Sequence, residues 1–497
     1  MKSTIIFKSS AGNLYLYDFV KKEIKPCHPL IYICSLIDEN YKLEDLVVKV
    51  KKANLKSYTD DDIFYYCSKF LHYKECGYFS SIKKNEFAKF EAKDIVEEIS
   101  NINNIVFEVT EACNLQCKYC AYGDLYDNYD LRTNKNMTFK TIKTVFDYLL
   151  PFWKSPRNKS VNQIISVGFY GGEPLMNFGL IRETVSYCNN LNIPNRDFLF
   201  TMTTNATLID KHIDFLVENK FKITISIDGD EYGNSYRVFH NSTSSFRKVF
   251  DNVKMIQTKY PEYFHKYISF NSVLHNRNSI ETTHKFISEN FNKTPEIHTI
   301  NSSGIKKEKM NEFIKMYVNY DNSLIDKGVI KQRFTSDASI FSLCQFLLWY
   351  GNNQFYDFES FLYSDRSKIV ARTGTCFPFS RKMYITANGK ILPCEKIDTQ
   401  YFLGTINDKG IDLNLESIAK KYNDYYSKIY SLCKECFMIN GCKQCIFQLN
   451  IKGKNEKIEC NGFCKEFKML NYFKENIDIL EDKNITMTEI LNNVYLS

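Results

Sequence analysis

Three cysteines stand close together in the stretch Cys113-Asn114-Leu115-Gln116-Cys117-Lys118-Tyr119-Cys120, just after an apolar run at 105–110 that predicts a β-strand. Thiolates ligate iron–sulfur clusters, and three cysteines on one loop can bind three irons of a four-iron cluster. The next cysteine comes only after another 67 residues. We therefore predict that Cys113, Cys117 and Cys120 hold a cluster whose fourth iron is open to a small-molecule ligand. The alternatives are part of a zinc site or buried structural thiols.

Around this loop, short apolar β-rich runs alternate with helical patterns from residue 100 to 322. The predicted strands are 105–110, 165–170, 198–204, 221–227, 267–273 and 297–301. The predicted helices include 140–150, 210–219, 246–259, 279–291 and 306–322. Six βα repeats predict an α/β fold with a parallel sheet, barrel-like or open. In barrels of this kind the functional residues gather at the carboxyl ends of the strands.

A glycine motif ends the second predicted strand: Gly168-Phe169-Tyr170-Gly171-Gly172-Glu173-Pro174. Paired glycines let a ligand approach the backbone closely, and exposed amides beside a carboxylate can hold the amino group of a zwitterion. The motif could also be only a turn. It lies one βα unit after the cysteine loop, so we expect both on the same edge of the sheet.

The two motifs together resemble those of the radical S-adenosylmethionine (SAM) enzymes over roughly residues 100–320. The resemblance implies a partial (β/α)6 TIM-like barrel in which SAM chelates the open iron and is cleaved reductively to a 5′-deoxyadenosyl radical. It implies that Gly171, Gly172 and Glu173 fix the SAM amino group. It places Thr204 and Asn205 at the ribose, and Ser226, Asp228 and Arg237 along the SAM site. Ordinary capping of strand ends is the alternative for Thr204, Asn205 and Ser226.

Cysteines return in dense groups from about residue 340. They are Cys376, Cys394, Cys433, Cys436, Cys442, Cys445, Cys460 and Cys464. Paired Cys-x2-Cys is also typical of zinc knuckles, but only five residues separate the two pairs. The poor apolar periodicity here predicts a loop-rich domain held together by metal.

This pattern resembles the SPASM extension of radical SAM enzymes, which implies two auxiliary four-iron clusters within residues 340–497 and three clusters in all. The resemblance implies that Cys376, Cys394 and Cys445 share one cluster and that Cys433, Cys436 and Cys442 share the other. Which of Cys460 and Cys464 completes each set stays open. Six further cysteines are expected to be mostly buried and structural, with Cys344 a possible spare ligand: Cys27, Cys34, Cys67, Cys76, Cys188 and Cys344.

Residues 1–85 have no clustered cysteines and predict a small module. An alternating segment at 13–19 predicts a strand, patterns at 29–38, 43–52 and 60–74 predict helices, and Gly77-Tyr78-Phe79 predicts a second extended segment. The module resembles the winged-helix element that binds the leader of a ribosomally made precursor peptide. It would add the leader as a strand beside 13–19. A helical cap on the barrel is the alternative.

The resulting hypothesis is a radical SAM peptide maturase that forms a thioether or carbon–carbon cross-link, or makes another C–H modification. Such an enzyme needs an electron donor, namely a reductase, a flavodoxin or a ferredoxin. One alternative is an anaerobic sulfatase maturase, which forms formylglycine. Another is a zinc-stabilised binding protein. The sequence reveals no general acid or base.

The formal net charge of +7 comes from Lys and Arg that are scattered among Asp and Glu. This mixture indicates a solvated surface rather than a nucleic-acid footprint. The apolar run at the start is too short for a signal peptide, and no apolar run reaches the length of a membrane span. We expect a cytoplasmic protein that contacts neither membrane nor nucleic acid.

Overall fold

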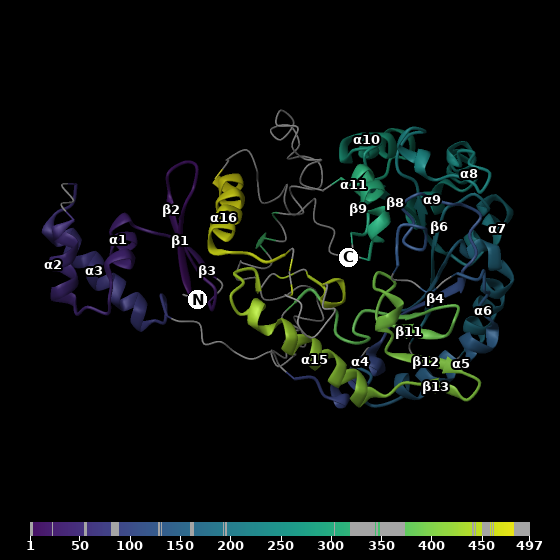
Figure 1. The fold of residues 1–497 in the computed structure, drawn as a ribbon, viewed down its shortest axis with the longest axis horizontal. Helices are drawn as coiled ribbons and strands as arrows, with labels where there is room; N and C mark the ends of the chain where they lie inside the picture. The colour runs from purple at the N-terminus through teal and green to yellow at the C-terminus, as the bar shows by residue number, and fades with distance from the viewer. Residues whose placement is uncertain are drawn as a thin grey trace.

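The computed structural model describes residues 3–21, 23–53, 57–80, 89–127, 130, 132–159, 164–191, 193, 196–302, 304–318, 343, 346–347, 373–439, 442, 444–449, 458, 460 and 462–481. Its largest feature is a ten-stranded sheet in the order β13-β12-β11-β10-β4-β5-β6-β7-β8-β9. Figure 1 shows this sheet and its helices at one end of the molecule and a small three-stranded sheet towards the other.

Six parallel strands form the centre of the large sheet, each close to its predicted position. They are β4 (Asn104–Thr110), β5 (Ile165–Gly171), β6 (Phe198–Thr204), β7 (Lys222–Ser226), β8 (Ile268–Leu274) and β9 (Pro295–Thr299). Each strand pairs in parallel with the next one along the chain. The prediction of an α/β fold with a large parallel sheet is confirmed.

Helices follow the strands and cover the apolar face of the sheet. Their bounds are α4 (Ala92–Asn101), α5 (Phe139–Trp153), α6 (Phe178–Asn190), α7 (Ile213–Glu218), α8 (Phe246–Lys259), α9 (Pro261–Tyr267), α10 (Ile280–Phe291) and α11 (Met310–Met316). On β4, Ile105, Phe107 and Val109 are fully buried in the core that these helices share. The alternate side chains, such as Glu108 on β4 and Tyr170 on β5, point to the other face, where the polar groups gather.

The C-terminal part contains more regular structure than the sequence suggested. Strand β10 (Met383–Ile385) pairs in parallel with β4, and β11 (Lys390–Leu392), β12 (Gly404–Asn407) and β13 (Gly410–Asp412) continue antiparallel from it. Two helices follow, α15 (Leu415–Cys433) and α16 (Glu466–Glu481). The expectation of a loop-rich texture is therefore wrong for residues 383–433. These strands have three or four residues each, too few to produce a visible period.

The N-terminal part forms an antiparallel sheet, β1 (Thr4–Lys8), β2 (Leu14–Asp18) and β3 (Glu23–Pro26), followed by α1 (Pro29–Ile37), α2 (Leu43–Lys52) and α3 (Asp60–Glu75). The helices are where the sequence predicts them. The extended segment predicted at Gly77-Tyr78-Phe79 is wrong, because these residues form a turn after α3. The predicted position of an added strand beside 13–19 is also wrong, since β2 is the central strand and both of its edges are paired.

The isolated cysteines follow the expectation with one exception. Cys27, Cys34, Cys67 and Cys188 are buried, whereas Cys76 is exposed at the end of α3. Cys344 lies outside the described residues.

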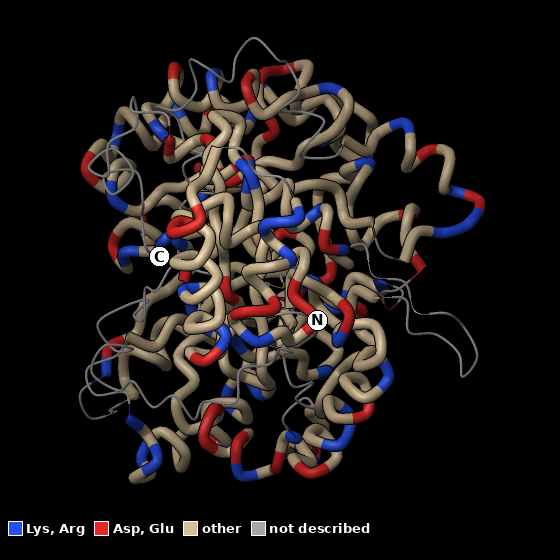
Figure 2. Tube along the Cα trace, turned by 90° about the vertical axis from the view of Figure 1, so that its left-hand side faces the viewer, with Lys and Arg blue, Asp and Glu red and all other residues tan. Residues whose placement is uncertain are grey.

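Figure 2 shows Lys and Arg interspersed with Asp and Glu along the coloured part of the trace. Across the described ranges, no helix is both long enough and apolar enough to cross a membrane.

Candidate iron–sulfur and SAM site

The loop with the first three cysteines leaves the carboxyl end of β4 and is braced by a second segment. The Gln116 amide donates to the Val238 carbonyl at 2.7 Å, and the Lys118 amide donates to the Tyr236 carbonyl at 3.1 Å. These bonds hold the loop against residues 236–239 and place all three thiols at one edge of the sheet. Each of the three cysteines is partly buried.

The three thiols lie close enough to influence one another. Burial is the main cause that raises the pKa of Cys113 to about 11 and that of Cys117 to about 12, and the neighbouring thiols contribute to both increases. A metal ion reverses this effect because its positive charge stabilises the thiolates. Three mutually interacting thiols on one loop therefore fit a cluster with three cysteine ligands.

In the described ranges, no three His, Cys, Asp or Glu side chains converge as they would around a single metal ion. In a four-iron cluster with cysteine ligands each thiolate binds its own iron, so the sulfurs stand further apart than around one ion.

Two glycines allow the second strand to pass directly against the start of the cysteine loop. A Cβ atom on Gly171 would lie 2.4 Å from the Thr110 carbonyl oxygen, and one on Gly172 would lie 2.1 Å from the Ala112 carbonyl oxygen. The amides there are used internally: the Gly172 amide donates to Thr110 O at 2.9 Å, and the Glu173 amide donates to Ala112 O at 2.8 Å. The glycines thus fix the position of the cysteine loop.

Glu173 is fully buried and joins the ends of two strands. Its carboxylate accepts hydrogen bonds from Thr204 Oγ1 at 2.7 Å, from the Asn205 amide at 2.8 Å and from the Leu175 amide at 3.1 Å. Burial raises the pKa of Glu173 to about 7, against the opposing effect of these bonds. Three of the predicted SAM-site residues are therefore brought together, with Thr204 directed at Glu173.

Asn205 links this cluster to the cysteines. Its side-chain amide donates to Asn114 Oδ1 at 2.9 Å, and its nitrogen lies 3.9 Å from Cys113 Sγ. Asn114 in turn donates to Thr207 Oγ1 at 2.8 Å. Asn114 was missed by the sequence interpretation, although its position inside the cysteine motif was a usable signal.

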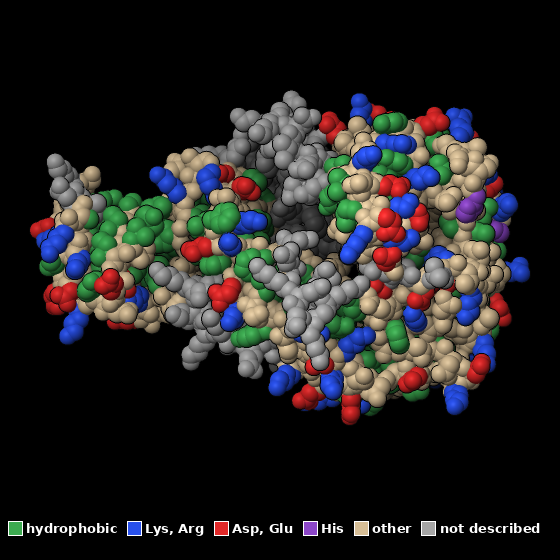
Figure 3. Space-filling model, in the orientation of Figure 1, with side chains coloured by type: hydrophobic (Ala, Val, Ile, Leu, Met, Phe, Trp, Pro, Cys, Tyr) green, Lys and Arg blue, Asp and Glu red, His purple; other side chains and the backbone are tan. Residues whose placement is uncertain are grey.

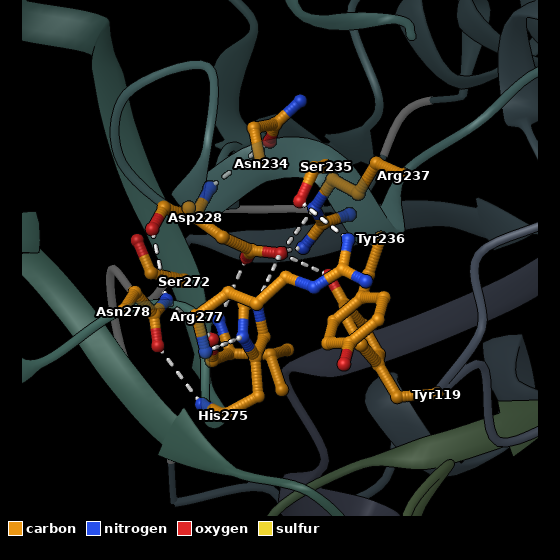
Figure 4. A network of polar contacts seen from close by, with 12 residues as sticks. Tyr119, Asp228, Asn234, Ser235, Tyr236, Arg237, Ser272, His275, Arg277 and Asn278 are labelled. Carbon is orange, nitrogen blue, oxygen red and sulfur yellow. Dashed lines mark hydrogen bonds and ion pairs between the residues drawn. The ribbon is translucent and has the colours of Figure 1, made fainter. Parts of the chain in front are cut away.

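A second buried network lies beside the middle of the cysteine loop (Figure 4). Asp228 accepts two hydrogen bonds from Arg237, from Nε at 3.0 Å and from Nη2 at 2.9 Å. It also accepts hydrogen bonds from the Tyr119 hydroxyl and, at 2.9 Å, from the Val273 amide. Burial alone would raise the pKa of Asp228, but the Arg237 charge and the hydrogen-bond donors hold it well below its usual range. Asp228 therefore stays ionised.

Arg237 is thus held mainly by Asp228, and its charge offsets part of the increase that burial causes in the pKa of Cys117. Two of its nitrogens already donate to Asp228, so any contact with a SAM carboxylate would use what remains of the guanidinium. Ser226 ends β7 and is half-buried on the polar face of the sheet. The specific contacts of these residues with SAM stay predictions.

His275 is a further residue that the sequence interpretation missed. It follows the end of β8, is fully buried, and stacks on the Tyr119 ring with centroids 5.6 Å apart. Its Nδ1 accepts from the Arg277 amide at 3.1 Å, which leaves the proton on Nε2, 3.6 Å from Asp228 Oδ2. A polar residue just after a predicted strand was the available signal.

The C-terminal cysteines form two groups. In the first, Cys376 interacts electrostatically with both Cys394 and Cys445, and the Ile446 amide donates to Thr375 Oγ1 at 2.8 Å, which ties the two segments together. In the second, Cys433 interacts with Cys442, Cys436 and Cys460. The assignment of each cysteine triplet to one cluster stays a prediction.

Cys460 and Cys464 both lie beside the second group. The Cys460 thiol interacts with Cys442 and Cys436, and the Cys464 amide donates to Cys436 Sγ at 3.4 Å. The final division of these two cysteines between clusters stays a prediction.

Comparison with known proteins defines the class. Residues 107–289 match the radical SAM superfamily. The chain is 38% identical over 148 residues to the uncharacterized protein MJ0907 of Methanocaldococcus jannaschii, covering 30% of this chain and 46% of that protein. It is 25% identical over 398 residues to a cysteine-type anaerobic sulfatase-maturating enzyme of Clostridium novyi, covering 77% of this chain and 97% of the enzyme.

A longer match joins the chain to the radical SAM cyclopropyl synthase TigE of Paramaledivibacter caminithermalis, with 22% identity over 480 residues that cover 90% of this chain and 93% of the synthase. Among solved structures, anSMEcpe with bound AdoMet and a Kp18Cys peptide is similar, with a TM-score of 0.52 at 20% identity, covering 77% of this chain and 99% of that one. This likeness shows a shared fold.

Residues 107–289 are therefore a radical SAM superfamily domain, homologous to those of sulfatase-maturating enzymes and of a cyclopropyl synthase. The protein is an enzyme, which removes the zinc-stabilised binding protein from consideration. A domain of this kind implies a four-iron cluster and SAM as cofactors.

Proposed function

We propose that this enzyme modifies a ribosomally made precursor peptide, using SAM and three four-iron clusters. Cys113, Cys117 and Cys120 would hold a four-iron cluster, and this group would supply the electron for the reductive cleavage of SAM to a 5′-deoxyadenosyl radical. Gly171, Gly172 and Glu173 would hold the backbone at the end of β5 in place beside the proposed SAM site. The product is a thioether or carbon–carbon cross-link, or another C–H modification.

The observation that carries the peptide proposal is the N-terminal part, a three-stranded sheet followed by three helices. With β2 in the centre, a leader strand would add at an edge, beside β3 or β1. Figure 3 shows apolar side chains gathered on this part of the molecule, and the exposed ones include Leu36 of α1 and Phe64 and Tyr65 of α3. They offer apolar surface to a bound peptide.

The proposed domains are a leader-recognition module at 1–85, a radical SAM core at 100–322 and a SPASM domain at 340–497. The match to the sulfatase-maturating enzyme leaves about a quarter of this chain uncovered, whereas the match to the cyclopropyl synthase covers 90% of it. The part of this chain that the sulfatase-maturating enzyme does not match supports the proposal that the substrate is bound by a separate module. A reductase, flavodoxin or ferredoxin would supply the electrons.

The cleavage proposal is tested with anaerobically prepared protein, SAM and dithionite. We expect 5′-deoxyadenosine from the native enzyme and none from Cys117→Ala, because the variant removes one iron ligand. The matched control is Cys188→Ala, since Cys188 is a buried thiol of α6 away from the site. Native rates of cleavage by Cys117→Ala would refute the assignment.

Sulfatase maturation is the second candidate, because 97% of the Clostridium novyi enzyme aligns with this chain. Mass spectrometry of a cysteine-containing sulfatase peptide after turnover separates the two. Formation of an aldehyde supports sulfatase maturation. Modification of a precursor peptide that depends on its leader supports the peptide maturase.

A further inference from the structure

The Tyr422 hydroxyl is a buried polar group without a partner among the described residues. The side chain lies on α15 and is fully buried. A buried hydroxyl that loses water and gains no hydrogen bond is costly, so such groups are rare in native proteins and call for an explanation. A tyrosine hydroxyl is protonated at neutral pH and can donate one hydrogen bond.

The ring of Tyr422 is fixed by its neighbours. It packs edge-on against Phe447 with centroids 5.3 Å apart and against Phe90 at 6.1 Å. Aromatic contacts of this kind hold a side chain in one orientation. The unpartnered hydroxyl is therefore held in place and cannot turn out to solvent.

The segments around Tyr422 include those that carry the first C-terminal cysteine group. Phe447, which packs on the Tyr422 ring, follows Cys445 by two residues, and electrostatic interaction with Cys445, Cys376 and Cys394 accompanies this packing. The hydrogen bond between the Ile446 amide and Thr375 Oγ1 fixes the two segments that carry Cys445 and Cys376. The Tyr422 side chain thus packs against the segment that carries Cys445, and that segment is tied to the one that carries Cys376.

We propose that the Tyr422 hydroxyl donates a hydrogen bond to a sulfur of the cluster on Cys376, Cys394 and Cys445. The inference rests on the proposed iron–sulfur role of these thiols. Hydrogen bonds to cluster sulfurs stabilise the more negative, reduced state and so raise the reduction potential. Tyr422 is then a positioning and tuning residue for one auxiliary cluster.

The test is Tyr422→Phe in the full chain, reconstituted anaerobically with iron and sulfide. Phenylalanine keeps the ring contacts and removes only the hydroxyl. In a redox titration followed by electron paramagnetic resonance, we expect one cluster to shift to a more negative potential and the other two to stay unchanged. The signal that shifts must be the one that Cys394→Ala removes.

The matched control is Tyr426→Phe, one turn further along α15, because the Tyr426 hydroxyl already has the Thr373 hydroxyl at 3.3 Å. We expect it to leave the potential of that cluster unchanged. Unshifted potentials in Tyr422→Phe with a native iron content would overturn the inference while leaving the proposed function intact. If Cys394→Ala instead had the iron content and all the cluster signals of the unmodified protein, both the inference and the proposed set of three clusters would be overturned.

Thermal unfolding of the loaded protein gives a second readout. If the hydroxyl bonds to the cluster, Tyr422→Phe lowers the midpoint. If it has no partner at all, removing a buried unpaired hydroxyl raises the midpoint, which would contradict the inference.

Discussion

At the scale of single residues, the Asp228–Arg237 pair defines the environment of the cysteine loop. Both side chains are buried, with 8% of Arg237 and none of Asp228 exposed. Two parallel hydrogen bonds match the guanidinium to the carboxylate. Asp228 also accepts from the Tyr119 hydroxyl, so one carboxylate orients the arginine and a residue of the cysteine motif together.

Asp228→Asn should therefore destabilise the protein by about 3–5 kcal/mol, because it leaves the Arg237 charge buried and unpaired. The matched control is Asp251→Asn, whose partner Arg247 forms an exposed pair at 3.1 Å on α8. Exposed pairs of this type contribute only about 0.3–0.5 kcal/mol. Denaturant unfolding measures both variants. An equal decrease in unfolding free energy for the two variants would show that the buried pair contributes no more to stability than the exposed pair.

The pH dependence of this pair has a definite sign. The folded pKa of Asp228 lies below its unfolded value of 3.8, so its contribution to stability is full above that pH. The contribution is lost as the pH falls below about 4 towards the depressed folded value. The difference in unfolding free energy between native protein and Asp228→Asn should therefore be constant from pH 5 to 7 and shrink in more acidic solution. A difference that grows on acidification would contradict this assignment.

The sequence predicted several residues that the structure brings close together, but it did not predict their hydrogen-bond partners. Cys113, Cys117 and Cys120 were predicted because cluster ligands follow a short local spacing. The pairing of Asp228 with Arg237 depends on how the loop after β7 folds back, which no local pattern records. Thr204 was likewise predicted to contact a ligand, whereas the structure directs its hydroxyl to Glu173.

At the scale of elements, the close contact between the end of β5 and the start of the cysteine loop positions the whole site. Only glycine permits this contact at position 172, because a Cβ atom there would lie 2.1 Å from the Ala112 carbonyl oxygen. The obstacle is backbone, which cannot move aside as the end of a flexible side chain can. The two motifs found in the sequence are thus mechanically linked.

Gly172→Ala should cost about 3 kcal/mol or more and reduce iron binding, because it pushes the cysteine loop away from β5. Gly179→Ala is the matched control, since nothing lies within 4 Å of its added Cβ and it sits in α6. Alanine in a helix should be neutral or stabilise by about 0.5–1 kcal/mol. Iron content and thermal midpoints test both. If the Gly172→Ala protein bound iron normally, the position of the cysteine loop would not depend on the glycine motif.

The elements that the sequence predicted well are those with several apolar residues in a regular pattern. The parallel strands β4 to β8 fall into this class, whereas β9 has a single isoleucine and begins two residues before its predicted position. Strands β10 to β13 escaped prediction because each contains only three or four residues. Their place in the sheet is decided by pairing with β4 and with one another rather than by local sequence.

At the scale of the whole molecule, the small N-terminal sheet packs on helix α16 from the far end of the chain. Phe473 lies against Phe7 and Tyr17, with ring centroids 5.4 and 4.6 Å apart. Polar contacts surround this core, including the Ser10 amide to Asp478 at 2.6 Å. The other face of the sheet packs on α1 to α3. A leader bound at this sheet would therefore be held next to the C-terminal region.

Phe473→Ala should loosen this junction by about 3–5 kcal/mol, because it removes a large side chain from the centre of the contact. Hydrogen–deuterium exchange should then become faster in β1 and β2 while the parallel sheet stays protected. Phe467→Ala on the same helix is the control, as 57% of that side chain is exposed. Unchanged exchange in Phe473→Ala would mean that the junction does not depend on this contact.

The pairing of β10 with β4 also has a consequence for how the enzyme is made. Glu108 and the Ala387 amide, which hydrogen-bond across this junction, lie 279 positions apart in the chain. At synthesis rates of about 5–20 residues per second, the outer edge of β4 waits roughly 15–60 s for its partner. During that interval an open strand edge is available to other nascent chains. A transcript that stopped before residue 383 would encode all six parallel strands and the first three cysteines, yet yield a product prone to aggregate along β4.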